Sequence, residues 1–325
     1  MNALEIREIA VAYQKSRIVL TAVELDVFTL FGKESHNAET VAKALKLNKN
    51  ATERLLNALV ALKLLEKNNE NFSNTHDSLM YLSKNSPGYM AGLMHTNHLW
   101  NTWSHLTEVV ETGIPAHDVE IKNRGEGWLK AFIHAMHDRG MKQAAAQIAK
   151  IDLQGVESVL DIGGGSGCFS MAFLNRKPEL RTAVFDLPEV IPISKKIIDK
   201  EGFSGRIEHY KGNYTTDELP EGFDLAFLSA VIHSNSYETN QELVKKCYHS
   251  LNKNGKIVIQ DWIMNDAKTE PVRGAIFSIN MLVGVQGGDC YSENEIRTWL
   301  INAGFSDIRK IEPESSTGQM IGVKK

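Results

Sequence analysis

A glycine-rich segment lies near the middle of the chain. The apolar run Ser158–Ile162, which contains Asp161, leads directly into Gly163–Gly167. Glycine has no Cβ, so a ligand can approach this backbone closely before the next helix begins. The dinucleotide fingerprint G-x-G-x-x-G/A fails because Cys168 stands at its third glycine position. A second acid, Asp186, ends the next apolar run, where a carboxylate can bind two ribose hydroxyls. The set favours a nucleoside ligand without a pyrophosphate.

Two further polar side chains follow apolar runs. His233 comes after Leu225–Leu228, and Asp261 directly follows Lys256–Gln260. Ligands of open α/β sheets bind at the carboxyl ends of the strands, which is where these two residues are expected. Histidine is suited to remove a proton at neutral pH, and a carboxylate can hold its ring and favour its charged form. A lone histidine is usually a surface or core residue, so the strand-end position is what favours a functional interpretation.

Short apolar runs alternate with amphipathic helices throughout the second half of the chain. The runs are Ser158–Ile162, Thr182–Phe185, Ile207–Tyr210, Leu225–Leu228, Lys256–Gln260, Ser306–Ile311 and Gln319–Val323. This alternation predicts an α/β fold with a parallel sheet that helices cover on both faces. The last two runs lie too close together for a helical crossover, so we expect them to form an antiparallel edge hairpin.

Residues 1–150 are expected to be almost wholly helical. Apolar residues recur every three or four positions in Ala38–Leu45 and in Ala51–Leu65. The polar stretch Lys67–Asn71 and the following Phe72–Thr75 indicate a small hairpin, and this order is typical of a winged helix-turn-helix. The change of pattern near Ile151–Gly155 predicts two domains, residues 1–150 and 151–325.

The composition is that of an ordinary globular protein. The 325 residues are 42% hydrophobic and carry a formal charge of −4, so no electrostatic attraction to nucleic acid or to an anionic membrane is expected. Three cysteines make a disulfide framework unlikely and fit a reducing compartment. The N-terminus lacks a signal-peptide core, and no stretch approaches the roughly 18 apolar residues of a membrane helix. We therefore expect a cytoplasmic protein.

Several motifs together resemble the class I S-adenosylmethionine-dependent O-methyltransferases of the two-domain type. This family includes plant caffeate and flavonoid enzymes, acetylserotonin methyltransferase, and bacterial antibiotic and pigment methyltransferases. Besides the glycine segment, the matching motifs are Glu24–Phe28, Glu111–Gly113, Asp186–Pro188, Asn254–Lys256, Gly287–Gly288 and Ala303–Phe305. The resemblance implies a winged-helix-like dimerisation domain that also caps the acceptor site. It implies that a Rossmann-like methyltransferase sheet follows, and that the enzyme is a homodimer that needs no metal.

The resemblance also implies which residues bind the cofactor. The backbone near Gly163 and Gly165 would face the methionine part, Asp186 would bind the ribose, and Leu187 would lie beside the adenine. Ser229 matches a position that reaches the cofactor carboxylate in many relatives, and Gly140 matches another cofactor contact that is usually serine. The full set implied for S-adenosylmethionine is Asp161, Gly163, Gly165, Asp186, Leu187, Asn213, Tyr214 and Ser229.

By the same resemblance, His233 is the general base that deprotonates an acceptor hydroxyl, and Asp261 orients it. The expected acceptor is a small aromatic or conjugated molecule, and the residues expected to line its site are Met94, His98, Phe132, Met136 and Met281. Besides Gly140, the chain departs from the family pattern at three places. The chain has Asn213 after the third strand, where relatives usually have an acid that contacts the adenine amino group. It reads His233–Asn235 where relatives have His-Asp-Trp, and it has Cys290 at the position of a second acid, with Asp289 one residue before.

Several alternatives remain at this point. The altered surroundings of His233 leave open a carbon- or sulfur-methylating enzyme of the same fold. A catalytically silent scaffold that only binds the cofactor is another alternative. A winged-helix DNA-binding regulator is disfavoured, because residues 1–90 hold 11 basic and 10 acidic side chains. Two histidine pairs, His95 with His98 and His134 with His137, have metal-ligand spacing but lack a cysteine or acidic pair nearby, so no metal is expected.

Overall fold

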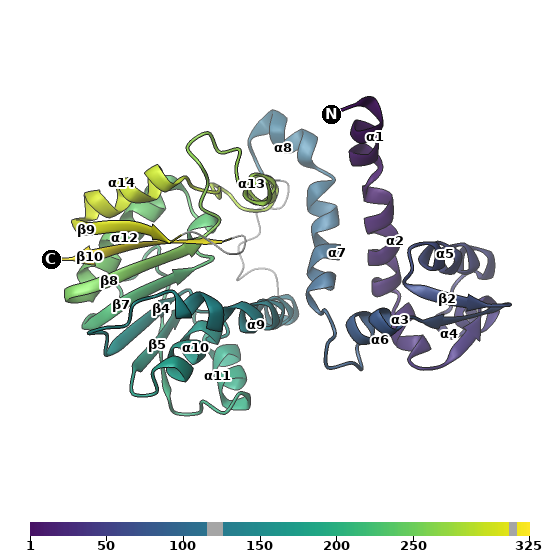
Figure 1. Ribbon diagram of the computed structural model, residues 1–325, viewed down its shortest axis with the longest axis horizontal. Coiled ribbons are helices and arrows are strands. Elements are labelled where there is room, and N and C mark those ends of the chain that lie inside the picture. Colours follow the sequence, from purple (N-terminus) through teal and green to yellow (C-terminus); the bar gives the residue numbers. More distant parts are fainter. Residues whose placement is uncertain (116–125, 312–316) are drawn as a thin grey trace. The chain divides into compact units, whose positions relative to one another are not determined.

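The computed structural model describes residues 1–115, 126–311 and 317–325. The chain divides into two compact units, Met1–Asn101 and Thr102–Lys325 (Figure 1). This division precedes the boundary at residue 150 that the change of sequence pattern indicated. The reason is that the long helix α9 (Glu126–Ala149) packs against α10 (Cys168–Arg176), with Ala144 and Ile148 buried in the core of the second unit.

The N-terminal unit contains a small sheet as well as helices. Its elements are α1 (Ala3–Val11), α2 (Tyr13–Glu24), α3 (Val27–Phe31), β1 (Ser35–Asn37), α4 (Ala38–Leu45), α5 (Lys49–Ala61), β2 (Leu65–Asn68), β3 (Asn71–Asn74), α6 (His76–Leu82) and the first part of α7 (Gly92–Trp103). The three antiparallel strands are ordered β1-β3-β2, and they close over a core that includes Phe28, Leu56 and Phe72. The helix–helix–hairpin order expected for a winged helix is therefore present.

Two details of this unit differ from the expectation. The helix expected to run to Leu65 ends at Ala61, because Lys63 adopts a left-handed conformation (φ 62°) and Leu65 begins β2. The hairpin pairs Leu65–Asn68 with Asn71–Asn74, so its first strand starts earlier than the polar stretch indicated. The strand β1 was not predicted, because its three residues are too few for a clear alternating pattern.

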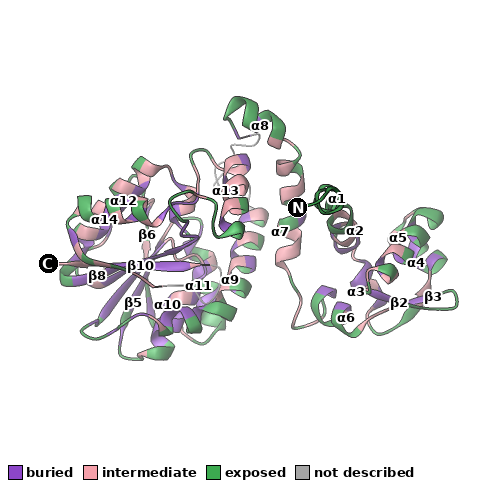
Figure 2. Ribbon diagram, turned by 45° about the horizontal axis from the view of Figure 1, so that its top comes forward, coloured by how far each residue is buried: buried purple, intermediate pink, exposed green. Residues whose placement is uncertain are grey.

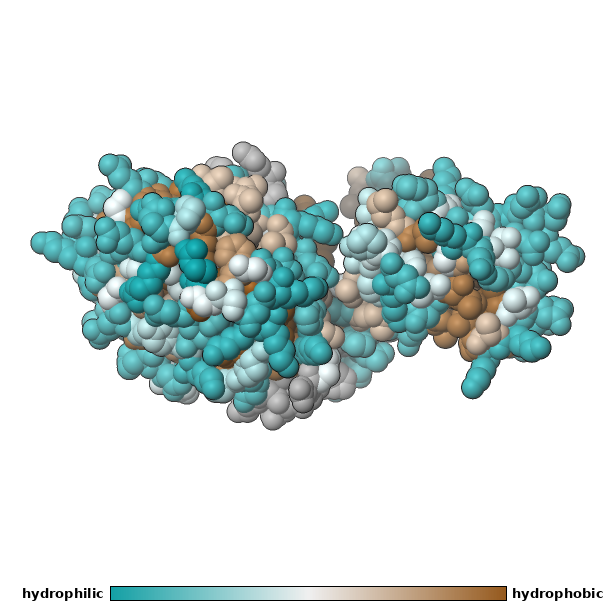
Figure 3. Space-filling model, turned by 90° about the horizontal axis from the view of Figure 1, so that it is seen from below, coloured by the Kyte–Doolittle hydropathy of each residue, from teal (hydrophilic) through white to brown (hydrophobic). Residues whose placement is uncertain are grey.

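Helix α1 carries apolar side chains that this chain alone does not cover. Leu4 is 67% exposed, Ile6 56% and Ile9 65%, and no residue of α1 is buried. Figure 2 shows α1 in the colour of exposed residues. Figure 3, seen from below, shows a different patch of apolar residues on the N-terminal unit. The resemblance implied a dimerisation domain in this half of the chain, and an apolar helical face that one chain leaves exposed suits such a domain.

The second unit is built on a seven-stranded sheet ordered β6-β5-β4-β7-β8-β10-β9. The strands are β4 (Ser158–Ile162), β5 (Arg181–Asp186), β6 (Ile207–Lys211), β7 (Phe223–Ser229), β8 (Leu251–Asp261), β9 (Phe305–Ile311) and β10 (Gly318–Lys324). Neighbouring strands from β6 through β8 are parallel, and β10 is antiparallel to both β8 and β9. The expected Rossmann-like sheet with its antiparallel edge pair is confirmed.

Helices cover both faces of this sheet because successive strand residues point to opposite sides. Leu225 and Phe227 of β7 pack into one core with α9, α10 and α11 (Ile191–Lys200). Ala226 and Leu228 face the other core, which contains residues of α12 (Tyr237–Ser250) and α14 (Glu293–Ala303). The remaining elements are α8 (Leu106–Thr112), the short helix η2 (Ile232–Ser234) and α13 (Val272–Gly284).

The motif Asn254–Lys256 was expected to form a turn before the fifth strand. It lies inside β8, where it forms an irregularity. Pairing with β7 jumps from Leu251 to Lys256, and Asn254 between them has a positive φ of 64°. Among the helices that the structure describes, none is long and apolar enough to cross a membrane.

Candidate active site

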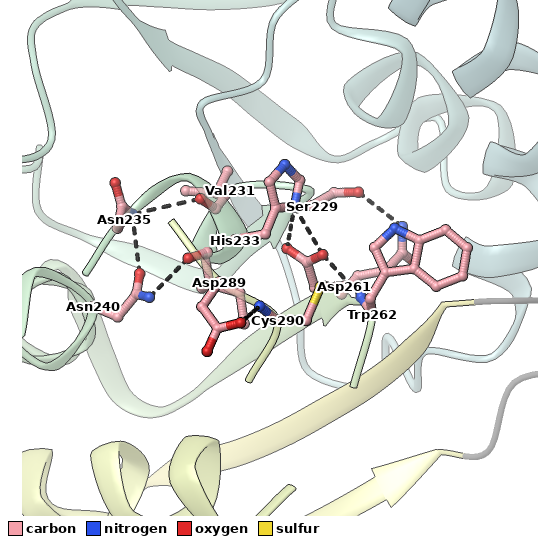
Figure 4. A network of polar contacts seen from close by, with 11 residues as sticks. Ser229, Val231, His233, Asn235, Asn240, Asp261, Trp262, Asp289 and Cys290 are labelled. Atoms are coloured by element: carbon pink, nitrogen blue, oxygen red, sulfur yellow. Dashed lines mark hydrogen bonds and ion pairs between the residues drawn. The ribbon is translucent and has the colours of Figure 1, made fainter. Parts of the chain in front are cut away.

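His233 and Asp261 meet at the carboxyl edge of the sheet. His233 lies in η2, just after β7, and Asp261 is the last residue of the adjacent strand β8. The Nδ1 atom of His233 is 2.9 Å from Oδ1 and 3.0 Å from Oδ2 of Asp261, as Figure 4 shows. The His233 side chain is 13% exposed and that of Asp261 only 2%. A carboxylate at this distance favours the tautomer with the proton on Nδ1, which leaves the Nε2 lone pair as a base.

A buried amide network holds the segment that carries His233. Asn235 donates through Nδ2 to Oδ1 of Asn240 at 3.0 Å, and Asn240 donates to the carbonyl of Ile232 at 2.8 Å. The hydroxyl of Tyr214 donates to Oδ1 of Asn235 at 3.3 Å. Asn235 stands where the family pattern has a tryptophan. Its side-chain amide forms hydrogen bonds that link the loop after β6 to η2.

The residues at the position of the second acid point in different directions. Cys290 is buried beside Trp262, Met264 and Phe277. The Asp289 carboxylate accepts from Ser278 and from the Cys290 amide, and in Figure 4 it points away from the imidazole. Burial and the carboxylate of Asp261 raise the pKa of Cys290 to about 12, so this thiol stays neutral. Asp261 is thus the one acid bonded to His233 among the residues that the structure describes.

The glycine segment after β4 forms a cradle at the same edge of the sheet. Gly163 and Gly165 have φ of 65° and 54°, which favour glycine. A Cβ added to Gly163 would lie 2.9 Å from Cγ2 of Val231, so no larger residue fits there. The Gly165 amide donates to Oδ2 of Asp186 at 2.7 Å, and the Leu187 amide donates to Oδ1 at 2.7 Å. These bonds hold the Asp186 carboxylate beside the half-buried backbone of the cradle.

Both acids of the first two strands titrate above their ordinary range. Burial raises the pKa of Asp161 to about 7, even though Oδ2 accepts from the Ser170 hydroxyl at 2.9 Å. Burial also raises the pKa of Asp186 to about 6 against the two backbone hydrogen bonds that lower it. Perturbed carboxylates in a cradle of this kind are typical of functional sites.

The side chain of Asn213, in the loop after β6, is already hydrogen-bonded within that loop. Oδ1 of Asn213 accepts from the amide of Thr215 at 3.0 Å and from its hydroxyl at 2.8 Å. The contact expected between this oxygen and an adenine amino group would therefore compete with the loop's own turn. Tyr214 lies closer to the cradle, since a Cβ on Gly163 would be 3.7 Å from its ring.

Sequence reasoning missed a group of buried amides beside Ser229. Gln260 of β8 donates to the Ser229 hydroxyl at 2.8 Å and to Oε1 of Gln147 on α9 at 3.0 Å. Gln319 of β10 donates to Oε1 of Gln260 at 2.8 Å. Nor did the sequence indicate that His137 lies beside the cradle, where its Nδ1 is 3.2 Å from the hydroxyl of Ser166. Glutamines that interrupt apolar strand runs were the available signal.

The residues expected around the acceptor fall in both units. Phe132 and Met136 lie on α9 and Met281 on α13, within the second unit, and Met281 is 7% exposed. Met94 and His98 lie on the part of α7 that belongs to the N-terminal unit. On the catalytic side, Phe277 of α13 packs edge-on against the His233 ring, with 4.9 Å between ring centroids. Met94, His98, Phe132, Met136 and Met281 remain predictions as acceptor contacts.

Gly140 provides a close approach between α9 and α10. A Cβ on Gly140 would lie 2.4 Å from Sγ of the buried Cys168, whereas a Cβ on Gly127 of the same helix would meet nothing within 4 Å. We expect Gly140→Ala to lower the free energy of unfolding by about 1–3 kcal/mol through overpacking. Gly127→Ala should raise it by up to about 1 kcal/mol through helix propensity. Urea unfolding of both variants measures the difference.

The matched test adds Cys168→Ala to the Gly140→Ala variant. Removing the sulfur should recover most of the lost stability, because the two substitutions act on one contact. Additive losses in the double variant would contradict the overpacking explanation.

Comparison with known proteins identifies a domain in each half of the chain. Residues 103–306 match the O-methyltransferase domain, and residues 8–84 match the O-methyltransferase dimerisation domain. The chain belongs to the O-methyltransferase family. The family indicated by the sequence motifs is confirmed, and the N-terminal unit of this O-methyltransferase carries the dimerisation domain.

Three similar proteins illustrate the relationship. The 3-hydroxy-5-methyl-1-naphthoate 3-O-methyltransferase of Streptomyces sahachiroi is 30% identical over 98% of this chain and 94% of its own length. The N,N-dimethyltransferase OxyT of Streptomyces rimosus is 28% identical over 94% of this chain and 91% of its own length. The solved structure of PigF with SAH covers the whole of both chains with a TM-score of 0.92 at 21% identity. Its fold is therefore shared by this O-methyltransferase.

Proposed function

We propose that this O-methyltransferase moves a methyl group from S-adenosylmethionine to a hydroxyl of a small aromatic or conjugated acceptor. His233 is the general base and Asp261 holds it. The observation that carries the proposal is the buried His233–Asp261 pair at the same sheet edge as the glycine cradle and Asp186. The relative that acts on a hydroxynaphthoate supports an aromatic acceptor.

The cradle suits S-adenosylmethionine. Gly165 has a positive φ, and a Cβ added there would meet only Cδ1 of Ile133, at 3.9 Å, so the methionine part can approach this backbone closely. Asp186 offers carboxylate oxygens for the ribose hydroxyls, while Leu187 and Tyr214 offer apolar surface for the adenine. When bound, the cofactor supplies a sulfonium methyl group and a good leaving group. The other residues proposed to bind the cofactor are Asp161, Gly163, Asn213 and Ser229.

The chain's own part in the reaction is alignment and proton transfer. With Nδ1–H donated to Asp261, Nε2 of His233 can accept the proton of an acceptor hydroxyl. Asp261 then stabilises the imidazolium, as a carboxylate does in other histidine pairs. Phe277 packs against the ring edge-on and restricts its orientation. Holding the cofactor and the acceptor together at one sheet edge accounts for most of the remaining rate enhancement.

Two further roles belong to the same proposal. The exposed apolar residues of α1 and the dimerisation domain support a homodimer. Phe132, Met136 and Met281, with Met94 and His98 of the N-terminal unit, are proposed to contact the acceptor. Methionine and aromatic side chains suit a flat apolar ring. Transfer to nitrogen, carbon or sulfur is the alternative outcome, and the similar N,N-dimethyltransferase is an observation that favours testing it.

The affinity for S-adenosylhomocysteine should depend on pH. The pKa of Asp186 is raised to about 6 by burial, so the carboxylate is protonated below pH 6 and loses acceptor capacity for the ribose. Binding is then strongest well above pH 6, and it weakens about tenfold from pH 7.5 to pH 5, of which about fivefold falls between pH 6 and pH 5. Calorimetric titration at pH 5, 6 and 7.5 measures it. In Asp186→Asn the dependence should flatten, and an equal slope in both proteins would contradict the assignment.

A screen of acceptors tests the reaction itself. Purified dimer is incubated with S-adenosylmethionine and phenolic, quinone, amine and thiol acceptors, and products are analysed by mass spectrometry. An O-methylated phenol supports the proposal, and methylation only at nitrogen, carbon or sulfur establishes the alternative. A gel-shift experiment with duplex DNA at low salt should show no complex, and a complex would favour a regulator.

A further inference from the structure

The loops on both sides of α13 are joined by a charged cluster outside the His233–Asp261 pair. Nζ of Lys268, in the loop before α13, is 2.8 Å from Oδ2 of Asp289 and 3.1 Å from Oε1 of Glu295. Nζ also lies 5.3 Å from the ring centroid of Tyr291. The other carboxylate oxygen of Asp289 accepts from the hydroxyl of Ser278 on α13 and from the Cys290 amide. One carboxylate thus connects both loops and the helix between them.

The same residue contacts the segment that carries the base. The Asp289 amide donates to the carbonyl oxygen of His233 at 3.1 Å. The preceding Gly288 packs so closely that a Cβ there would lie 2.8 Å from that carbonyl oxygen. Ser278, which the carboxylate holds, is the neighbour of Phe277, whose ring contacts the imidazole. Asp289 therefore touches the His233 backbone on one side and the α13 residue next to its ring partner on the other.

The ion pairs of this cluster fix the positions of side chains but contribute little to the free energy of unfolding. The side chains of Lys268 and Asp289 are 38% and 35% exposed, and ion pairs at such positions contribute about 0–1 kcal/mol. Although burial raises the pKa of Asp289, Lys268 and Ser278 lower it by more, so the carboxylate stays charged at neutral pH. Both of its oxygens are used by Lys268, Ser278 and the Cys290 amide, so it is not a second acid on the imidazole.

We propose that Asp289 is a positioning residue for the base: it fixes α13 and Phe277 against His233 through Ser278 and Lys268. This inference rests on the proposed function, since it assigns a role around the same histidine. It predicts that loosening the cluster slows the chemical step and leaves cofactor binding intact, because the cradle lies on other loops.

The test compares Asp289→Ala with Asp289→Asn and with the control Asp266→Ala. Asp266 is an exposed acid of the same loop as Lys268, and it accepts from Asn294 rather than from α13. We expect Asp289→Ala to lower kcat about 10–100-fold. The S-adenosylhomocysteine Kd should stay within about twofold, since no cradle contact is lost. Asp289→Asn should recover most of kcat because its amide oxygen can still accept from Ser278 and Cys290, and Asp266→Ala should match the unmodified enzyme.

Other outcomes separate the inference from the proposed function. An unmodified enzyme that methylates no acceptor refutes the proposed function, whereas an active enzyme with equal kcat in Asp289→Ala and Asp266→Ala refutes the inference. A parallel loss of cofactor affinity in Asp289→Ala shows a general structural role and also overturns it. If Asp289→Ala does not fold, Ser278→Ala removes only one hydroxyl. Its kcat must then fall with the cofactor Kd unchanged, and an unchanged kcat overturns the inference.

Discussion

Replacing His233 with alanine should lower kcat by about 10²–10⁴-fold, the usual contribution of a positioned general base. The Nε2 atom of His233 is the proposed proton acceptor, and the variant has no other base bonded to Asp261 in the described part of the chain. The affinity for S-adenosylmethionine should change little, because the imidazole is not part of the glycine cradle. Single-turnover methylation of the acceptor found in the screen, with calorimetry of cofactor binding, measures both quantities.

Two further variants test the assignment of His233 as the general base. Asp261→Asn should cause a loss in the same range, because an amide can hold the ring in the wrong tautomer. His249→Ala removes an exposed histidine at the end of α12 in the same unit and should leave kcat unchanged. An active His233→Ala enzyme with a normal kcat would show that the acceptor loses its proton elsewhere, and the acid–base role would have to be withdrawn.

Asp186→Ala should weaken cofactor binding by at least about 100-fold. Hydrogen bonds to a charged group contribute about 1.5–3 kcal/mol each, and the proposed ribose contact would involve two of them. The substitution also frees the amides of Gly165 and Leu187, which Asp186 now holds at 2.7 Å, so the cradle loses its shape. Calorimetric titration with S-adenosylhomocysteine measures the change in Kd.

The control is Asp199→Ala, which removes an exposed acid of α11, the helix that follows β5. It should bind like the unmodified protein. Asp186→Asn should fall between the two, because its amide keeps one acceptor oxygen. Micromolar binding retained in a folded Asp186→Ala protein would place the ribose at another residue.

Local patterns determined the architecture of the second unit and the neighbourhood of its site. The strand β4 matched its expected range of Ser158–Ile162, and the other strands differ from theirs mainly by extra residues at the ends, six of them in β8. Strand patterns are readable because burial on both faces leaves a continuous apolar run. Because parallel strands end at one edge, the position of His233 and Asp261 after two such runs, together with the family resemblance, predicted that they lie together.

Sequence patterns failed where a contact depends on which way a side chain points. Cys290 and Asp289 are neighbours in the chain, yet one is buried near Asp261 and the other binds Lys268 and Ser278. The commitment of the Asn213 oxygen to Thr215 and the contact of Gly140 with Cys168 were equally invisible. The strand β1 has three residues, which is too few for an alternating pattern to show.

The sequence by itself therefore determined the family, the sheet and the residue types gathered at its carboxyl edge. These follow from periodicity and from motifs that are local in the chain. Only the tertiary structure decided which oxygen accepts from which donor, that Asp261 alone of the described acids holds His233, and that Asp289 joins α13 to the base. The physical reason is that hydrogen-bond partners distant in the chain are selected by packing, to within a few tenths of an ångström, after the strands have come together.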